Sequence, residues 1–399
     1  MKKLLLGVCL LLSATLALAQ MPRETRQAVL HAMQQKNYAQ AVQLLRPWAE
    51  RGDAQARYGL GLMHYHGQGV AQDYAKAREW FEKAAAQGDA DAQYNLGVMY
   101  SNGQSVARDS AKAREWYEKA AAQGDTGAQN NLGVMYRDGQ GVMQDYAKAR
   151  KWFEKAAAQG DTEAQNNLGS MYHDGQGVAQ DYAKARKWFE KAAAQGEAAA
   201  QYNLGTMYYH AQGIAQDYVK ARKWFEKAAA QGLAAAQFNL GLMYYHAQGV
   251  AKDYVKAREW WGKAAAQGNA DAQYNFGFMY HDGRGGAQDY TKARAWWEKA
   301  AAQGNANAQY NLGVMYRDGQ GVAQDYAKAR EWWEKAAAQG DVDAQYNLGF
   351  MYYDGRGGVR NYAKAREWFE KVAAQTENAE NTEVVRKARQ ILEQIRQMR

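Results

Sequence analysis

The chain has 399 residues, a formal net charge of +8, a single cysteine and only two prolines. Charged residues at 23% exclude a protein embedded in a membrane along most of its length, and 47% hydrophobic with 13% aromatic residues exclude a disordered chain. Its 39 glycines exceed the usual share of about 7%, which indicates that they serve a regular structure.

Residues 1–19 have the features of a secretory signal peptide. Two lysines precede a largely apolar run, residues 4–18, which is too short to span a bilayer and ends in the small residues of a cleavage site. We therefore expect cleavage after Ala19, export to the periplasm or the medium, and no stable membrane insertion afterwards. Cys9 lies within this segment, so the mature chain would carry no thiol for disulfides, catalysis or metal binding.

Residues 20–52 are expected to form a capping helix pair. Tyr38 and Gly52 stand 36 residues before Tyr74 and Gly88, their counterparts in a longer repeating pattern. The rest of that pattern is only partly matched here. Such degeneracy is typical of the unit that ends a repeat array.

From residue 53 to residue 376 a segment of 36 residues recurs nine times. The copies begin at Asp53, Asp89, Asp125, Asp161, Glu197, Leu233, Asn269, Asn305 and Asp341. Each copy predicts two helices that begin after capping side chains and are joined by a glycine-containing turn. A lone helix pair cannot bury both of its apolar faces, whereas stacked pairs share one core. The sequence therefore predicts an all-α fold, an α-solenoid of nine helix-turn-helix repeats.

The repeated residues resemble a known family. Each copy approximates Ala-x-Tyr-Asn-Leu-Gly-x-Met-Tyr, then Gly-Gln-Gly-Val, Asp-Tyr-Ala-Lys-Ala, a tryptophan, Ala-Ala and Gly. This pattern, over residues 53–376, is similar to the Sel1-like repeat, a relative of the tetratricopeptide repeat. The resemblance implies a right-handed superhelix of α/α pairs and an adaptor that binds other macromolecules, in envelope or host-interaction processes for exported bacterial members. Some cysteine-rich members bind or hydrolyse β-lactams, but this mature chain lacks their paired cysteines.

Two columns of the repeat are uniform and are expected to pack in the core. Methionine fills the column from Met63 to Met351, and tryptophan fills the column from Trp80 to Trp368, in all nine copies. Three copies double the tryptophan, at Trp260-Trp261, Trp296-Trp297 and Trp332-Trp333. The larger second ring is expected to fill the layer between repeats. Stacking against a sugar is the alternative.

A variable stripe on the first helix is the candidate partner-binding surface. In the second copy it comprises Asp91, Tyr94, Val98 and Ser101, on the side of the helix across from the expected core. We expect it to face away from that core and to line the concave groove that the resemblance implies. Its last column is rich in tyrosine and arginine, which often anchor interfaces. This column reads Tyr65, Ser101, Arg137, His173, Tyr209, Tyr245, His281, Arg317 and Tyr353. Random variation at solvated positions is the alternative.

An asparagine column runs between the stripe and the expected core. It comprises Asn95, Asn131, Asn167, Asn203, Asn239, Asn275, Asn311 and Asn347, with Gly59 in the first copy. Because an amide both donates and accepts, these side chains can bind the backbone of an extended peptide, for which Asn203, Asn239 and Asn275 are the test positions. They can equally bond neighbouring helices inside the scaffold. The sequence leaves both interpretations open.

Leu233 departs from the capping pattern. It stands where most copies place an aspartate or asparagine. Because leucine has no side-chain acceptor, one backbone N–H at the start of the next helix should lack its capping hydrogen bond. We expect a softer joint between the fifth and sixth repeats.

The sequence predicts no catalytic residues, no cofactor and no metal site. Four serines remain in the mature chain, none with a histidine and an aspartate placed for a catalytic triad. His66, His210 and His246 share one column, but no reliable third ligand accompanies them. Basic and acidic residues are interspersed, 38 against 36 over residues 53–376, which argues against a nucleic-acid partner.

Residues 377–399 are expected to cap the C-terminal end of the solenoid with one amphipathic helix. Taken together, these features predict an exported scaffold that binds protein partners through the first-helix groove. A binder of cell-wall glycan (peptidoglycan) or of β-lactam-like ligands is the alternative function.

Overall fold

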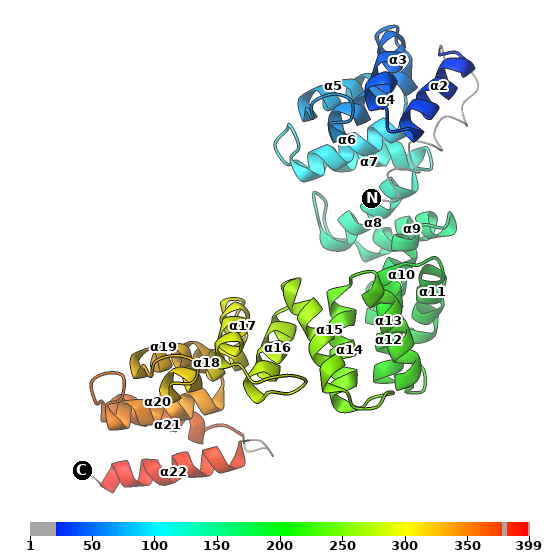
Figure 1. Cartoon of the computed structure of the whole chain (residues 1–399). Coiled ribbons are helices and arrows are strands. Elements are labelled where there is room, and N and C mark those ends of the chain that lie inside the picture. The colour runs from blue at the N-terminus through cyan, green and yellow to red at the C-terminus, as the bar shows by residue number, and fades with distance from the viewer. Residues whose placement is uncertain (1–20, 377–380, 398–399) are drawn as a thin grey trace. The chain divides into compact units, whose positions relative to one another are not determined.

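The computed structural model of the protein describes residues 21–376 and 381–397. Within these ranges every regular element is an α-helix, which confirms the all-α prediction (Figure 1). The expected signal peptide and its cleavage site at Ala19 lie outside the described residues. Residues 377–380 and 398–399 of the expected C-terminal cap also lie outside them.

Two helices precede the repeats and one follows them: α2 (Arg23–Gln34), α3 (Tyr38–Glu50) and α22 (Thr382–Gln397). The first helices of the repeats are α4 (Ala54–His66), α6 (Ala90–Asn102), α8 (Thr126–Asp138), α10 (Thr162–Asp174), α12 (Ala198–His210), α14 (Ala234–His246), α16 (Ala270–Asp282), α18 (Ala306–Asp318) and α20 (Val342–Asp354). The second helices are α5 (Tyr74–Ala85), α7 (Ser110–Ala122), α9 (Tyr146–Ala158), α11 (Tyr182–Ala194), α13 (Tyr218–Ala230), α15 (Tyr254–Ala266), α17 (Tyr290–Ala302), α19 (Tyr326–Ala338) and α21 (Tyr362–Ala373).

The chain divides into two compact units, one ending at Ala200 and one beginning at Gln201, within α12. In each unit, helices pack against the helices next to them in the sequence, as α4 does on α5 and α18 on α19. This nearest-neighbour packing defines a solenoid.

Capping side chains set the start of most helices. Asp89 Oδ1 accepts the Ala92 backbone N–H at 2.8 Å, and Asp109 Oδ1 accepts the Lys112 backbone N–H at 3.0 Å. At the start of α14, Leu233 provides no side-chain cap, as the sequence indicated. Such caps satisfy backbone donors that the helix itself leaves unpaired.

Each repeat contributes one layer of buried side chains. In the layer formed by α9 and α10, Phe153, Leu168 and Met171 are fully buried among alanines. The methionine column is buried, as predicted, with Met99 and Met279 also at 0% exposure. The tryptophan column differs from the prediction because its members are only half-buried, as Trp152 is. Phe153, the next residue, fills the core position instead.

The ends of the repeat array are covered by the flanking helices. At the N-terminal end Val29, Ala32 and Leu45 are buried against the first repeat. The Met21 backbone N–H donates to Asp53 Oδ2 at 3.0 Å, while Asp53 Oδ1 caps α4. At the C-terminal end, α22 packs the buried side chains Val385, Ala388 and Leu392 against α21.

Candidate partner-binding surface

The last column of the first-helix stripe is half-buried where the two helices of each repeat meet. The Tyr209 ring lies 5.2 Å from the Tyr218 ring and 6.4 Å from the Phe225 ring. The His281 ring lies 5.3 Å from the Trp297 ring. The prediction that this column faces away from the core is therefore only partly right, because the end of each first helix lies beside its second helix. Equivalent ring contacts join His173 to Tyr182, Tyr245 to Tyr254 and Tyr353 to Tyr362, at 5.1, 5.1 and 5.4 Å.

The same column joins consecutive repeats by hydrogen bonds. The Tyr209 hydroxyl donates to Gln248 Oε1 in the turn of the next repeat, at 2.6 Å. Equivalent contacts join Tyr65 to Gln104, Arg284 to Tyr245 and His281 to Gln320. Burial raises the pKa of Tyr209 above its usual value, although the hydrogen bond with Gln248 lowers it in part. These side chains hold the scaffold together as well as facing outward.

The two arginines of the column each pair with the aspartate that follows them. Arg137 Nε lies 2.7 Å from Asp138 Oδ1, and Arg317 Nε lies 2.6 Å from Asp318 Oδ1. The hydrogen bond with the adjacent carboxylate raises the pKa of each arginine above its usual value. Their side chains remain 27% and 37% exposed.

The asparagine column hydrogen bonds within the scaffold. Asn95 Nδ2 donates to the Asp91 carbonyl oxygen at 2.8 Å and to the Tyr58 hydroxyl of the preceding repeat at 3.4 Å. Asn167 Nδ2 donates to Asn130 Oδ1 at 3.0 Å. These contacts favour the in-scaffold alternative. Peptide binding by the half-buried Asn203, Asn239 and Asn275 stays a prediction.

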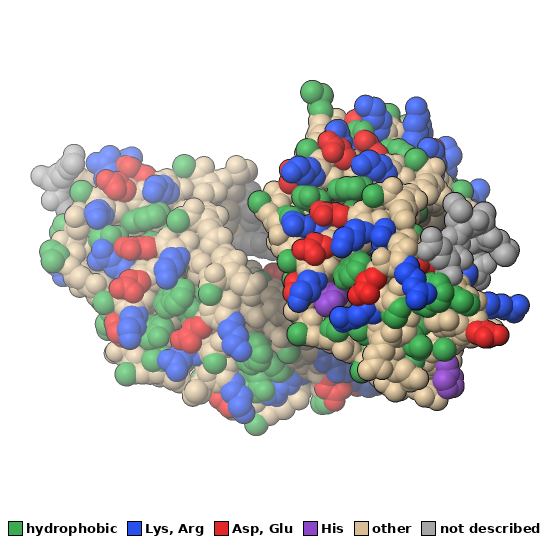
Figure 2. Space-filling view, turned by 90° about the horizontal axis from the view of Figure 1, so that it is seen from above, with side chains coloured by type: hydrophobic (Ala, Val, Ile, Leu, Met, Phe, Trp, Pro, Cys, Tyr) green, Lys and Arg blue, Asp and Glu red, His purple; other side chains and the backbone are tan. Residues whose placement is uncertain are grey.

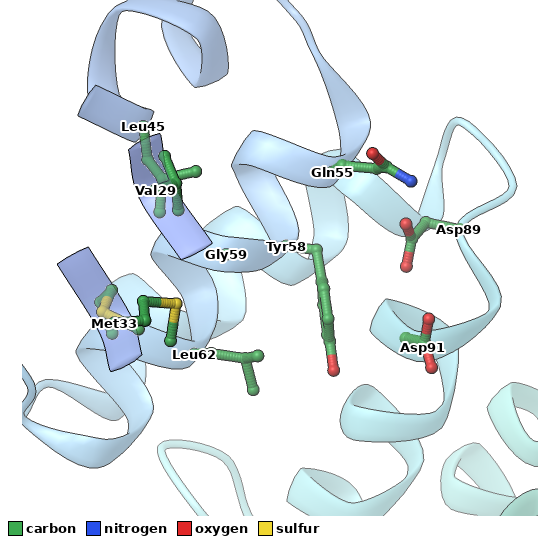
Figure 3. Close-up of a pocket in the computed structure, with 10 residues that line it drawn as sticks. Val29, Met33, Leu45, Gln55, Tyr58, Gly59, Leu62, Asp89 and Asp91 are labelled. Atoms are coloured by element: carbon green, nitrogen blue, oxygen red, sulfur yellow. The ribbon is translucent and has the colours of Figure 1, made fainter. Parts of the chain in front are cut away.

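A pocket opens on the first-helix surface of the first unit (Figure 3). It has a volume of about 520 Å³, including the part open to solvent. One wall is apolar and the other carries a tyrosine hydroxyl, an amide and two carboxylates, as Figure 3 shows. The lining residues are Val29, Met33, Leu45, Gln55, Tyr58, Gly59, Leu62, Met63, Asp89 and Asp91. Gln55, Tyr58 and Leu62 occupy the stripe positions of the first repeat, so this pocket lies on the predicted surface.

Half-buried acidic groups dominate the polar side of this pocket. Burial, followed by repulsion from Asp89 and Asp125, raises the pKa of Asp91 to about 7. Burial also raises the pKa values of Asp89 and Tyr58 above their usual values. A positively charged or hydrogen-bond-donating group would be favoured in such a site, because it would offset the cost of a buried carboxylate.

Gly59, the exception in the asparagine column, has a packing explanation that sequence reasoning missed. A Cβ atom at Gly59 would lie 3.1 Å from Leu45 Cδ1, on the N-terminal helix α3. The glycine therefore lets the capping helix approach the first repeat, and the pocket forms beside it. The signal in the sequence was that the exception falls in the copy next to the cap.

A second pocket lies on the first-helix surface of the second unit. Its volume is about 520 Å³, including the part open to solvent. The lining residues are Arg317, Tyr326, Trp333, Asn347, Phe350, Met351, Asp354 and Arg356. Arg317 and Phe350 belong to the stripe, and Asn347 belongs to the asparagine column. The structure thus brings predicted residues from two neighbouring repeats together around one opening.

The doubled tryptophans confirm the packing interpretation. Trp261, Trp297 and Trp333 are at most 2% exposed. Their indole N–H groups donate to the carbonyl oxygens of Phe238, Tyr274 and Tyr310, at 3.0–3.1 Å. Buried, bonded rings of this kind cannot stack against a sugar.

No catalytic or metal chemistry is evident in the described part of the chain. Among residues 21–376 and 381–397, no three histidine, cysteine or acidic side chains are grouped to hold a metal ion. The histidines of the predicted column pack edge-on against the preceding tyrosines, as His210 does at 4.8 Å from Tyr209. None of the helices in the described residues is both long enough and apolar enough to cross a membrane. Absence of an enzymatic activity stays a prediction.

Stacked two-helix repeats define the class of α-solenoid repeat proteins. The chain belongs to the Sel1 repeat family, which is matched ten times over residues 32–53, 54–89, 90–125, 126–161, 162–197, 198–233, 234–269, 270–305, 306–341 and 342–376. The first match is the degenerate half repeat that precedes the nine full copies.

Two solved structures illustrate the relationship. The chain is 37% identical to c5321, a protective antigen present in uropathogenic Escherichia coli strains that displays an SLR fold. That match covers 93% of this chain and 89% of the other, with a TM-score of 0.57. The chain is also 36% identical to a Sel1 repeat protein from Oxalobacter formigenes, over 78% of this chain and 90% of that one, with a TM-score of 0.58. No curated protein matched the chain.

Proposed function

We propose that this protein is a scaffold whose partner protein binds the first-helix surface. Proteins built from Sel1 repeats and related helical repeats generally serve as protein-interaction scaffolds, and the family is typically non-catalytic. The observation that carries the proposal is the location of the two pockets. Each opens at variable stripe positions of the first helices, although the two pockets are formed by different repeats.

The pockets differ in chemistry, and their lining residues indicate which partner side chains each one suits. The first combines an apolar wall with Asp89 and Asp91, which suits a lysine or arginine side chain whose methylene groups lie on the wall. The second places Arg317 and Arg356 around Phe350, which suits an acidic or aromatic side chain. The two pockets therefore suit partner side chains of opposite charge.

Site-specific photocrosslinking tests the proposal. A photoreactive amino acid is placed at Ser101 or Asp354 on the first-helix surface, and at Glu115 or Glu331 on exposed second-helix positions as matched controls. We expect crosslinked adducts with a partner from the first pair of positions only. Equal adducts from both pairs, or adducts from the controls alone, would contradict a first-helix binding surface.

Variants that leave the tyrosine contacts intact give a second test. Asp91→Asn and Arg317→Gln each remove a charge from one pocket without removing an aromatic ring from the scaffold. We expect weaker partner capture by both variants, with unchanged helix content by circular dichroism. Glu331→Gln, a change on an exposed second-helix position outside both pockets, is the control and should capture the partner as the native protein does.

We also propose that the protein is exported. The support is the basic and then apolar pattern of residues 1–19, together with the description of one relative as a protective antigen. Mass spectrometry of the protein recovered from its host should find Gln20 as the first residue. Recovery only of a chain that retains the residues before it, in the cytosol, would refute export by signal cleavage. Changing both leading lysines to glutamate should slow the cleavage.

A further inference from the structure

Three consecutive repeats carry the same open groove along their second helices. The grooves lie on α9, α11 and α13, with volumes of about 890, 900 and 890 Å³ including the part open to solvent. Each is lined by three lysines, one tryptophan, one glutamate and one alanine. For α9 these are Lys148, Lys151, Trp152, Glu154, Lys155 and Ala158. None of these residues belongs to the first-helix surface, so the inference is independent of the proposed function.

One lysine distinguishes these three repeats from the others. Lys151, Lys187 and Lys223 occupy a column that holds glutamate in five other copies and Ala295 in the remaining one. The five glutamates are Glu79, Glu115, Glu259, Glu331 and Glu367. As a result α9 has four basic side chains against one acidic, whereas α5 has three against two. On the face that Figure 2 shows, basic and acidic side chains are interspersed.

The tryptophan of each groove is an apolar platform beneath an ammonium group. Lys155 Nζ lies 4.2 Å from the centre of the Trp152 ring, and the α11 and α13 pairs measure 4.3 and 4.1 Å. The indole is half-buried because it packs against the core of the preceding repeat. The ring is therefore held in place by the scaffold, while the flexible lysine that covers it can move to admit a ligand.

We propose that these second-helix grooves bind an acidic polysaccharide. In each groove the lysine ammonium groups pair with a sugar carboxylate, and the indole face receives the C–H face of the sugar ring. The glutamate, Glu154 in α9, accepts hydrogen bonds from sugar hydroxyls. That carboxylate would repel the dense phosphates of a nucleic acid, which favours a hydroxyl-rich polymer. A ligand made of repeating units also suits the grooves of α9 and α11, which carry the same residues within one unit.

The other repeats suggest a substitution that tests the proposal and should leave the fold unchanged. A triple variant, Lys151→Glu, Lys187→Glu and Lys223→Glu, installs the residue that five sibling copies already carry at this position. The matched control changes the same three lysines to arginine, which keeps the charge. Binding of the purified protein to polygalacturonate is measured by calorimetry at low salt. Dextran serves as an uncharged glycan, and inorganic polyphosphate as a polyanion without sugar rings.

We expect binding to polygalacturonate and not to dextran. The glutamate variant should lose at least about tenfold in affinity, because like charges then face the carboxylates, and the arginine variant should stay within about threefold. Three results would overturn the proposal: no binding of polygalacturonate by the native protein, undiminished binding by the glutamate variant, or equally tight binding of polyphosphate. The last would show that the grooves recognise charge alone.

Discussion

Glycine has two separate roles in this repeat, and single residues distinguish them. Gly133 lies inside α8, and a Cβ atom added to it would lie 2.4 Å from the Phe153 ring. Gly160 follows α9 with a backbone φ of 93° and has nothing within 4 Å of its missing Cβ. The first glycine is required by a close helix approach, and the second by backbone conformation.

Gly133→Ala should therefore destabilise the protein although alanine is the better helix former. We expect a loss of about 1–3 kcal/mol in the free energy of unfolding, because the added methyl displaces a buried ring. Urea unfolding measures the loss. The double variant with Phe153→Leu makes room for the methyl group, so its loss should be smaller than the sum of the two single losses. Additive losses would show that the ring contact is not the cause.

Asp91 should make stability depend on pH near neutrality. Its folded pKa of about 7 lies above the usual 3.8, so between these values the folded state keeps a proton that the unfolded state releases. Stability contributed by the protonated group is therefore lost as pH rises from about 4 to about 7. Asp91→Asn should remove this slope and be more stable than the native protein at pH 7.5, by about 2 kcal/mol after allowing for solvent screening.

The comparison with Asp91→Asn isolates this group from the aspartates that cap second helices, such as Asp145 and Asp181, whose effect has the opposite sign. Hydrogen bonds from the first helical turn lower the pKa of Asp145 below its usual value, so stability from this cap is lost only when pH falls towards the acid range. Unfolding midpoints recorded from pH 4 to 8 should show the two proteins converging near pH 4. Parallel curves over the whole range would contradict the shifted pKa.

At the scale of single residues, the sequence could predict contacts that are local and could not predict those between repeats. Asp89 accepts a hydrogen bond from the backbone N–H of Ala92, so both partners of this cap lie in one short segment. The bond from Tyr209 to Gln248 spans 39 residues and depends on how two helix pairs stack. The stripe could therefore be placed on the first helix from its periodicity, while its inter-repeat bonds could not be foreseen.

Helix starts differ in strength along the array, and Leu233 marks the clearest case. Asp161 Oδ1 accepts the Ala164 backbone N–H at 2.8 Å, whereas α14 begins without such a bond. The Leu233 side chain instead packs against the core of its layer. The missing cap costs about 1 kcal/mol, and part of this cost is offset by the packing of the leucine.

Amide hydrogen exchange should show this difference. We expect faster exchange at residues 234–236 than at residues 162–164, and slower exchange there in Leu233→Asp than in the native protein. The effect on global stability should be below about 1 kcal/mol, because the variant gains a cap and loses a packed side chain. Equal protection of the two helix starts in the native protein would contradict the prediction of a less stable joint between the fifth and sixth repeats.

The tryptophan column shows a limit of repeat statistics at the scale of the helix. Uniformity in nine copies predicted a core residue, but Trp152 and Phe153 are adjacent and cannot both point to one helix face. The structure buries Phe153 fully and leaves Trp152 half-buried beneath Lys155. The helical period does separate the two columns, because Phe153 lies four residues after Ala149 and three before Ala156, on the same buried face, whereas Trp152 does not.

At the scale of the molecule, the repeat separates two kinds of surface. First helices carry variable residues and two pockets formed with neighbouring elements, which suits a partner of defined shape. Second helices carry nearly the same residues from copy to copy, with changes such as Lys151 that alter charge and leave the fold alone. The exposed side of either helix can vary without disturbing the other, because the buried layers lie between neighbouring helices.

Nearest-neighbour packing also predicts how the loss of one helix affects the stability of the others. Helix α22 buries Val385, Ala388 and Leu392 against the last repeat, where Phe369 and Val372 are fully buried. Deleting residues 382–399 would expose this layer and remove several buried side chains, at a cost of about 3–5 kcal/mol. In a solenoid that cost falls on the repeat that loses its neighbour.

Hydrogen exchange of the truncated protein should therefore change locally. We expect faster exchange in α20 and α21, little change in α18 and none in α4 to α9, since helices pack mainly against the next one or two helices along the chain. Leu392→Ala in the full chain is the milder control and should produce the same gradient with smaller amplitude. A uniform rise in exchange from α4 to α21 would mean that the repeats unfold as one cooperative block, and the nearest-neighbour description would then fail.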